Sequence, residues 1–432
     1  MNIPESSYPR VVVVGGGFAG SEMVRKLSAY PFQIILLDRN NYFTFQPLLY
    51  QVATAGLETN SVVSPLRRLF RADENILFRV GELKEVDSEK QRLFTSIGPI
   101  HYDYLVIATG SKPQFFDLQP EKLLTLKTLS DAAAIRNTVF EGMEKAVTLP
   151  VEDRPGYMNI VIVGGGPTGV ELAGAFAEMK KYVFPKDYPG LDLKQMEIHL
   201  IEGQDRLLST MSTAASENAR KFLEKMGVKV WLNELVEDYD GESIAINGRS
   251  IPCRNLIWSA GVVGNAVRGL TTEQIYDNKR IIVDKYNRVI GSKNIFAIGD
   301  VAHQTSENFP KGLPMLAPVA IQQGKHLANN LNRMRQKEDL IPFEYVDKGT
   351  MATIGRNKAV ADLPFVKIKG TLAWLAWMFV HLITLVGFRN KVITLINLIY
   401  NYFTYDRALR IIFHQKEKKF KPKEKAENLV EA

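Results

Sequence analysis

Residues 160–174 decide the fold of this chain, and they read Ile-Val-Ile-Val-Gly-Gly-Gly-Pro-Thr-Gly-Val-Glu-Leu-Ala-Gly. An apolar, β-branched run leads into a turn in which Gly164, Gly166 and Gly169 have the G-x-G-x-x-G spacing, and a helical pattern follows. In such a motif the glycines permit a tight turn, let the backbone approach a pyrophosphate and let helix and strand pack closely. The stretch therefore predicts a dinucleotide-binding strand, turn and helix.

The same pattern occurs near the start of the chain, where residues 11–20 end in Gly-Gly-Gly-Phe-Ala-Gly. We expect a strand and tight turn over residues 10–20, a helix over 21–29 and a second strand over 32–38, which together make a β-α-β unit. Two such motifs in one chain indicate two dinucleotide sites and, with them, electron transfer.

An acidic residue ends the strand that follows each glycine turn. Asp38 ends the first of these strands, and Glu202 ends the strand expected at residues 197–202, after an insertion at 180–195. In this fold an acid at that position bonds a ribose hydroxyl, and its carboxylate repels a 2′-phosphate. Glu202 therefore favours NADH over NADPH, and Glu171 adds an acidic side chain to the second motif.

The composition bounds the number of domains and excludes one kind of redox chemistry. A length of 432 residues predicts two or three domains. The single cysteine, Cys253, cannot form an intramolecular disulfide, which excludes enzymes that work through a redox-active cysteine pair, and we expect it to serve packing. No signal-peptide pattern precedes the first strand, which predicts a cytoplasmic chain.

The order of the segments indicates an inserted domain. Residues 294–302 form an apolar strand with Gly299 and Asp300 but no following G-x-x-G, so we expect it to return to the first sheet. The fold class is then α/β, with two Rossmann-like dinucleotide-binding domains, the second inserted in the first, and a C-terminal helical region. The expected limits are residues 1–130 and 286–348 for the first domain, 131–285 for the second and 349–432 for the C-terminal region.

Several connecting segments have simpler expectations. Residues 41–57 are aromatic-rich without a clear period and are expected to form a loop over the first nucleotide. Residues 102–110 are an apolar strand that ends in Thr109 and Gly110, and residues 317–331 are compatible with a helix. This helix carries Gln322 and Gln323, and because adjacent helical residues point in different directions, at most one of them faces a given site.

The C-terminal region changes character. Residues 370–388 contain no Asp, Glu, Lys or Arg, and a second apolar stretch covers residues 392–405. Two helices that lie on a membrane, with Trp and Tyr at headgroup depth, fit this pattern best. A membrane span and a buried dimer interface remain alternatives. His381 is expected to be structural, because no second ligand stands at metal spacing.

The net charge of +7 is concentrated at the end of the chain, where Lys416, Lys418, Lys419, Lys421, Lys423 and Lys425 lie close together. A Lys-rich tail beside an apolar segment suits an anionic membrane surface, and a solubilising tail is an equal alternative. No motif for binding nucleic acid accompanies the charge.

These motifs together resemble the type II NADH dehydrogenases, single-subunit NADH:quinone oxidoreductases that do not pump protons. The resemblance covers residues 11 to about 413 and is most specific in three stretches: Phe45-Gln46-Pro47-Leu48-Leu49-Tyr50-Gln51-Val52-Ala53, Ala317-Pro318-Val319-Ala320-Ile321-Gln322-Gln323-Gly324 and Ala373-Trp374-Leu375-Ala376-Trp377. Pro318 stands where the family's quinone motif often has Gln.

The resemblance implies the following sites. FAD would lie on the first glycine turn and NADH on the second, Glu171 would lie by the flavin ring, and Gln322 would lie at the quinone pocket. The implied FAD residues are Gly15, Gly17, Phe18, Ala19, Gly20, Asp38, Arg39, Gln46, Pro47, Val80, Ala108, Thr109, Gly110, Gly299 and Asp300; the NADH residues are Gly164, Gly166, Pro167, Thr168, Gly169 and Glu202; the quinone residues are Ala320, Gln322 and Gln323.

The implied mechanism passes a hydride from NADH to the flavin and then two electrons to a quinone, ubiquinone or menaquinone. Glu171 would hold or relay a proton, because a carboxyl near apolar rings has a raised pKa; its alternative is a solvated carboxylate at the helix start. The resemblance also implies a homodimer, peripheral on the cytoplasmic face of the cell membrane. Two rival functions share the fold: a soluble NADH-dependent reductase of ferredoxin or rubredoxin, and a flavin-binding signalling protein resembling the apoptosis-inducing flavoproteins.

Overall fold

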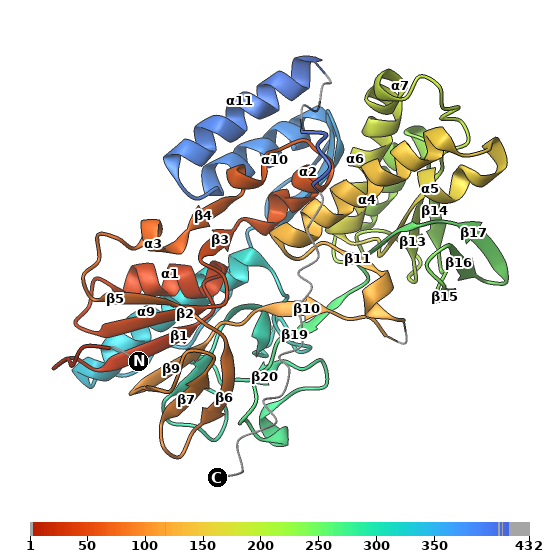
Figure 1. Ribbon diagram of the computed structural model, residues 1–432. Helices are drawn as coiled ribbons and strands as arrows, with labels where there is room; N and C mark the ends of the chain where they lie inside the picture. Colours follow the sequence, from red (N-terminus) through yellow and green to blue (C-terminus); the bar gives the residue numbers. More distant parts are fainter. Residues whose placement is uncertain (1–2, 117, 405–406, 408, 414–432) are drawn as a thin grey trace, which may run out of the picture.

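The computed structural model describes residues 3–116, 118–404, 407 and 409–413. Two parallel five-stranded sheets lie side by side, each covered by helices, and a pair of C-terminal helices lies above the junction between them (Figure 1). The carboxyl ends of parallel strands are where ligands bind in such sheets, and the glycine turns follow two of these strands.

The first sheet has the strand order β21-β9-β1-β2-β5, and all of its pairs are parallel. Its strands are β1 (Arg10–Val14), β2 (Gln33–Asp38), β5 (Ile76–Val80), β9 (Tyr104–Ile107) and β21 (Ile295–Ala297). Because β21 follows the whole second sheet in sequence and yet pairs with β9, the second domain is inserted in the first, as predicted.

The second sheet has the order β11-β18-β12-β13-β14 and is also parallel. Its strands are β11 (Leu124–Thr125), β12 (Ile160–Val163), β13 (Ile198–Glu202), β14 (Val228–Leu232) and β18 (Asn255–Trp258). Since β11 already belongs to this sheet, the second domain begins before residue 131, the limit expected from the sequence. A strand of two residues has too little pattern to be recognised. Cys253 is fully buried, in keeping with a packing role.

Helices cover both sheets, and the closest packing uses small residues. The helices are α1 (Phe18–Leu27), α3 (Leu66–Leu69), α4 (Leu129–Thr148), α5 (Pro155–Met158), α6 (Pro167–Tyr182), α7 (Phe184–Asp187), α8 (Thr213–Lys225) and α9 (Ala317–Gln336). On α9, a Cβ added to Gly324 would lie 2.4 Å from the carbonyl oxygen of Ala19 on α1, so the two helices touch at backbone distance.

Smaller sheets join and border the two domains. The antiparallel pair β10 (Ser111–Pro113) and β19 (Val262–Gly264) lies between the domains. The others consist of β3 (Tyr42–Thr44) and β4 (Val63–Pro65); β6 (Leu83–Asp87), β7 (Arg92–Thr95) and β8 (Ile100–His101); β15 (Val236–Tyr239), β16 (Ser243–Ile246) and β17 (Arg249–Pro252); β20 (Ile281–Ile282) and β22 (Ala302–His303); and β23 (Thr350–Gly355), β24 (Lys358–Asp362) and β25 (Lys367–Lys369).

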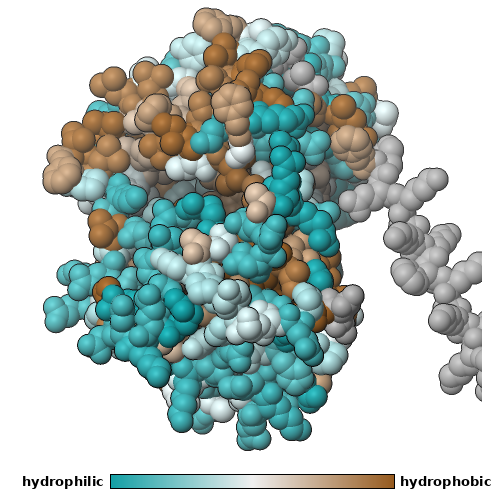
Figure 2. All heavy atoms as spheres, turned by 90° about the vertical axis from the view of Figure 1, so that its left-hand side faces the viewer, coloured by the Kyte–Doolittle hydropathy of each residue, from teal (hydrophilic) through white to brown (hydrophobic). Residues whose placement is uncertain are grey.

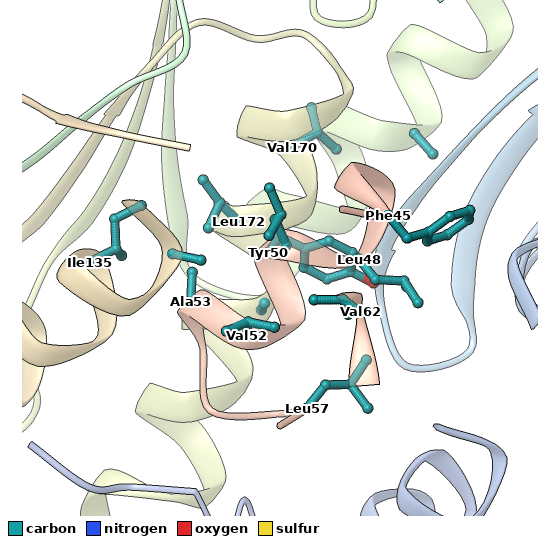
Figure 3. Close-up of a cluster of buried hydrophobic side chains, with 14 of the residues drawn as sticks. Phe45, Leu48, Tyr50, Val52, Ala53, Leu57, Val62, Ile135, Val170 and Leu172 are labelled. Atoms are coloured by element: carbon teal, nitrogen blue, oxygen red, sulfur yellow. The ribbon is translucent and has the colours of Figure 1, made fainter. Parts of the chain in front are cut away.

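Residues 41–57, expected to be a loop, are instead structured and buried. They contain β3, a 3-10 helix at Gln46–Leu48 and the helix α2 (Leu49–Ala53). Figure 3 shows Leu48, Tyr50 and Val52 of this segment packed among Ile135 of α4 and Val170 and Leu172 of α6. A short helix that is apolar on nearly all sides shows no helical period, which is why the sequence pattern misled.

The C-terminal region forms the two expected helices, α10 (Thr371–Thr384) and α11 (Phe388–Thr404). Large apolar side chains on them face solvent, among them Leu372, Phe379, Phe388 and Phe403, which are 64 to 83% exposed. Figure 2 shows apolar surface gathered in the upper part of the molecule, while its lower part is mostly polar. No helix among the described residues has the length and hydropathy needed to cross a bilayer. The lysine cluster predicted in the tail lies outside the described residues.

Candidate active site

The two glycine turns have nearly the same backbone geometry. Gly15 and Gly164 have φ angles of +108° and +111°, which disfavour any residue with a side chain. A Cβ added to Gly15 would lie 2.2 Å from the carbonyl oxygen of Ala108, and one added to Gly164 would lie 2.6 Å from the backbone of Ser259. Each turn is therefore pressed against the end of a neighbouring strand and has no room for a side chain.

The acid predicted for each turn is bonded to that turn. Asp38 Oδ2 accepts the N–H of Gly16 at 2.6 Å, and Glu202 Oε2 accepts the N–H of Gly165 at the same 2.6 Å. The other oxygen of each carboxylate accepts a backbone N–H two residues further along the chain. Burial raises the pKa of Asp38, against the lowering effect of its backbone hydrogen bonds. Both acids are thus held at the positions where the motif expects a ribose.

Open space lies in front of the helices that follow the turns. A Cβ added to Gly17 or Gly166, the residues immediately before α1 and α6, would meet no atom within 4 Å, and the same is true of Gly110 after β9. The free N–H groups at a helix N-terminus attract phosphate. These two openings fit the pyrophosphates of two dinucleotides, and α6 starts with Pro167 and Thr168 at its own opening.

The remaining residues expected at the first dinucleotide surround its turn from several segments. The Phe18 ring packs edge-on against Phe43, with 5.2 Å between the ring centroids. Gln46 and Pro47 begin the 3-10 helix Gln46–Leu48. Ala19 lies beside Gly299, Val80 pairs with Asp38 between β5 and β2, and Arg39 is exposed next to Asp38.

A polar cluster connects the two domains near Asp300. The Ser111 hydroxyl donates to Asp300 Oδ2 at 2.6 Å, and the Lys127 ammonium donates to Ser111 at 2.7 Å and lies 3.6 Å from Asp300. Thr109 Oγ1 donates to the carbonyl oxygen of Asn265 at 2.7 Å. Asp300 and Thr109 are therefore each bonded to a residue in or next to the β10–β19 pair.

The two adjacent glutamines of α9 point in different directions, as the helical geometry predicts. Gln323 is 1% exposed, and its Oε1 accepts the N–H of Gly299 at 2.8 Å. Gln322 is bonded to both backbone groups of Val346, at 2.9 and 3.1 Å. Ala320 lies on the same side of α9 as Gln323, because a Cβ added to Gly299 would lie 3.6 Å from the Ala320 methyl.

Glu171 lies in the wall of a cavity that is partly open to solvent. The walls come from α2, α6, β23, α10, α11 and Arg407. A Cβ on Gly174 of α6 would lie 2.4 Å from the carbonyl oxygen of Ile354, so β23 lies directly against α6 and brings Thr353 to Glu171. The Thr353 N–H donates to Glu171 Oε1 at a long 3.4 Å.

The surroundings of Glu171 favour its neutral form. The side chain is nearly buried, and among the described residues no Lys or Arg forms an ion pair with it. Burial raises the pKa of Glu171 to about 8, although the Thr353 N–H and the Trp377 indole, which lies beside the carboxyl, act to lower it. A carboxyl with this pKa carries a proton at neutral pH and can release it.

The sequence pattern gave Tyr50 no role and placed the Trp side chains of the C-terminal helices at headgroup depth, which is wrong for Trp377, because it is 2% exposed and lines this cavity. Tyr50 of α2 is 4% exposed, and its ring meets Trp377 of α10 edge-on at 6.1 Å. Trp377 stacks on His381 at 4.0 Å, and burial lowers the pKa of His381 to about 4. His381 is therefore a neutral packing group, as expected. Tyr50 lies within the family-specific stretch at residues 45–53, and this was the one feature of the sequence that could have pointed to it.

A largely buried ion pair also lines the cavity. Glu178, on the same helix as Glu171, bonds Arg407 at 3.1 Å, and Arg407 also donates to the carbonyl oxygen of Thr54 at 2.7 Å. The backbone N–H of Arg356 donates to the second oxygen of Glu178. The Arg356 guanidinium donates to the carbonyl oxygens of Asn401 and Tyr402, where a cation complements the C-terminus of α11. Nothing in the sequence pattern predicted this arrangement.

Two family models match the chain. The model described as pyridine nucleotide-disulphide oxidoreductase matches residues 9–324, and the model described as NDH2 C-terminal domain matches residues 348–405. The first covers both dinucleotide folds, and the second covers the region of β23–β25, α10 and α11.

Similar proteins match this chain over most of its length. Two proteins of Mycobacterium tuberculosis described as type II NADH:quinone oxidoreductases, NdhA and Ndh, are 31% and 30% identical, over 89% and 90% of this chain and 85% and 87% of their own. The solved structure of NDH2 from Plasmodium falciparum in complex with NADH matches with a TM-score of 0.84 at 22% identity, covering 92% of this chain and 99% of that one. The sulfide:quinone oxidoreductase of Aquifex aeolicus matches with a TM-score of 0.71 at 20% identity, over 91% of this chain and 95% of its own.

Proposed function

This chain belongs to the type II NADH:quinone oxidoreductases, within the pyridine nucleotide-disulphide oxidoreductase family, and we propose that it reduces its quinone in the cavity beside Glu171. It is thus an enzyme that oxidises NADH and reduces a quinone, and we propose that it does so without pumping protons. One observation carries the assignment of the site. Glu171 is a nearly buried carboxyl without a cationic partner among the described residues, and it lines a cavity between α6 and the C-terminal helices.

We propose that the first glycine turn holds FAD and the second holds NADH. The open space before α1 and α6 supports this, since each helix N-terminus is free to receive a pyrophosphate. Asp38 and Glu202 would bond the two riboses, and Thr109, Gly110 and Asp300 would line the rest of the FAD site. FAD, when bound, accepts a hydride from NADH and passes two electrons to an acceptor. NADH enters as substrate.

The role of Glu171 is to hold a proton for the quinone. Reduction of a quinone to a quinol takes up protons, and a carboxyl that is protonated at neutral pH can supply one without drawing water into the cavity. The Thr353 N–H and the Trp377 indole orient the carboxyl from β23 and α10.

The resemblance to the family implies a further contact of the quinone with Gln322 of α9, beside Ala320 and Gln323, although α9 contributes no residue to the walls of the cavity beside Glu171. Gln323 keeps the turn at Gly299 in place through its hydrogen bond to that N–H. Gln322 would exchange its bonds to Val346 for a bond to the quinone. A higher quinone KM in Gln322→Ala supports this role, and an unchanged KM removes it.

We further propose that α10 and α11 bind the surface of a membrane, on the cytoplasmic face, so that a lipid-soluble quinone reaches the cavity. The exposed side chains of Leu372, Phe379, Phe388 and Phe403 support this, because such an apolar surface is stabilised at the headgroup boundary. Flotation of the protein with vesicles containing anionic lipid tests the proposal. Flotation that persists when Phe379 and Phe388 are both changed to Ser contradicts it.

The chain is also proposed to form a homodimer, as its resemblance to the family implies. Light scattering of the purified protein in detergent gives the mass directly. A mass of one chain at all concentrations contradicts the proposal.

One experiment tests the function as a whole. The purified protein should show the absorption spectrum of a flavin, which NADH bleaches faster than NADPH and a soluble quinone restores. A flavin that NADH bleaches but no quinone restores contradicts quinone reduction. A protein without a flavin spectrum contradicts the FAD site.

A further inference from the structure

The cavity beside Glu171 is also lined by Tyr50, whose phenol carries a hydroxyl group. The side chain belongs to α2 and is 4% exposed, although its hydroxyl group is polar. In Figure 3 the ring extends away from Ile135, toward the side on which Phe45 lies. Tyr50 therefore presents its polar end to the cavity and its ring to the apolar core.

The hydroxyl group of Tyr50 has one partner, which occupies its oxygen. Gln51 Nε2 donates to this oxygen at 2.7 Å. Among the described residues no acceptor lies in hydrogen-bonding geometry for the proton of the hydroxyl group itself. A buried donor without an acceptor costs about 1 to 3 kcal/mol, so such groups in folded proteins call for a partner.

The neighbouring polar groups leave the cavity rich in donors. Glu171 carries a proton at neutral pH, and the Trp377 indole N–H lies toward its carboxyl without reaching full hydrogen-bonding geometry. The oxygens of Glu178 are already bonded to Arg407 and to the Arg356 N–H. A ligand that offers acceptors therefore suits this cavity, and the two carbonyl oxygens of a quinone are such acceptors.

Burial and the groups that face Tyr50 together keep it protonated. These groups are Glu178 of α6, Arg407 and, beyond Arg407, Arg356, together with Glu171, which becomes charged only above a pH of about 8. Burial comes first in raising the pKa of Tyr50 well above its usual value, the carboxylates add to this rise, and Arg407 opposes it. The Tyr50 hydroxyl group thus keeps its proton at any pH at which the enzyme works, and it can donate a hydrogen bond without giving the proton away.

We propose that Tyr50 is a further catalytic residue, whose hydroxyl group donates a hydrogen bond to a carbonyl oxygen of the quinone held beside Glu171. The proposal rests on the proposed function, since it needs the quinone to bind in this cavity. Gln51 has a positioning role, because its donation to the hydroxyl oxygen directs the remaining proton into the cavity. Tyr50 then orients the substrate, and Glu171 supplies the proton.

The test is Tyr50→Phe in the full chain with its flavin, assayed with NADH and a water-soluble benzoquinone. Loss of one neutral hydrogen bond should raise the quinone KM about three- to tenfold. The rate of bleaching by NADH and the pH midpoint of quinone reduction should stay as in the unaltered protein. The matched control is Tyr239→Phe, which removes a hydroxyl group that is as deeply buried but bonded to Gly241 in the β15–β17 sheet. It should change none of these values.

The outcomes separate this proposal from the function on which it rests. An unchanged quinone KM in Tyr50→Phe overturns the role of Tyr50 alone. A shifted pH midpoint with an unchanged KM also overturns it, because the hydroxyl group would then serve the carboxyl of Glu171 and not the quinone. If the unaltered protein is bleached by NADH and no quinone restores its colour, both proposals fall together.

Discussion

Glu202 at the glycine turn and Glu171 in the cavity belong to the same inserted domain and have the same carboxyl group, but their surroundings differ. Glu202 accepts two backbone N–H groups at 2.6 and 2.8 Å. Glu171 accepts one at 3.4 Å, and burial raises its pKa to about 8. A carboxylate whose oxygens are fixed by the backbone suits recognition of a ligand, whereas a carboxyl with few donors suits carrying a proton.

Glu178 shows that burial alone does not decide between these roles. It lies on α6 like Glu171 and borders the same cavity, but Arg407 and the Arg356 N–H bind its two oxygens. The presence of a cation and of N–H donors distinguishes the fixed carboxylates from the proton carrier. Four measurements test this distinction.

The largest effect is expected for Glu171→Gln, because an amide of the same shape cannot release a proton. Loss of a positioned acid slows proton transfer between about a hundred- and ten-thousandfold. We expect stopped-flow measurements to show this loss in the reoxidation of the flavin by quinone, with bleaching by NADH unchanged. Equal rates in both half-reactions of the variant and the unaltered protein would remove Glu171 from the mechanism.

The second-largest effect is expected for Arg407→Met, which leaves the largely buried Glu178 without its cation. Glu178 then resembles Glu171, which has no cationic partner among the described residues. Breaking a buried pair by removing one partner costs about 3 kcal/mol or more in the free energy of unfolding. Urea titration measures this loss. The control is Arg220→Met, which breaks an exposed pair with Glu224 and should cost less than about 1 kcal/mol. Equal losses in the two variants would mean that the pair at Glu178 behaves like a surface pair.

The glycine turn that binds Glu202 could be predicted from the sequence, whereas the cavity beside Glu171 could not. Gly164, Gly165 and Glu202 act through backbone geometry that a short motif encodes, so their arrangement follows from spacing. The fold class follows in the same way, because the return of residues 294–302 to the first sheet is visible in one apolar strand with Gly299 and Asp300.

The cavity is assembled from segments that are distant in sequence and that give weak local signals. The helix α2 was expected to be a loop, and neither the long helix α4 nor the hairpin of β23 and β24 was predicted. The position of Thr353 beside Glu171 depends on Gly174, whose lack of a side chain lets β23 approach α6. Only the resemblance to a family pointed to Glu171, and no local pattern reveals that Arg407 pairs with Glu178.

The pH dependence of quinone reduction should be of intermediate size. Because the pKa of Glu171 is raised to about 8, the carboxyl carries its proton below that pH and loses it above. We expect the rate of quinone reduction to be level below pH 8 and then to fall about tenfold for each further pH unit, as the protonated fraction does. Stopped-flow reoxidation across this range measures it. The fall should be absent in Glu171→Gln, and a fall that persists there would assign it to another group.

The smallest effect is expected at the turn, in Glu202→Gln. An amide oxygen can still accept the N–H of Gly165, whereas the amide nitrogen cannot accept the N–H of Gln204. The turn should therefore keep its bond at Gly165 and lose one backbone bond together with the negative charge that repels a 2′-phosphate. Removing one exposed charge interaction of about 1 kcal/mol should raise the preference for NADPH relative to NADH about fivefold, measured as the ratio of kcat/KM values. Asp38→Asn is the matched control, because Asp38 accepts the N–H of Gly16 in the same way at the other turn. It should weaken retention of the flavin and leave the ratio unchanged. If Asp38→Asn changes the ratio and Glu202→Gln does not, the two turns hold their dinucleotides in the opposite order.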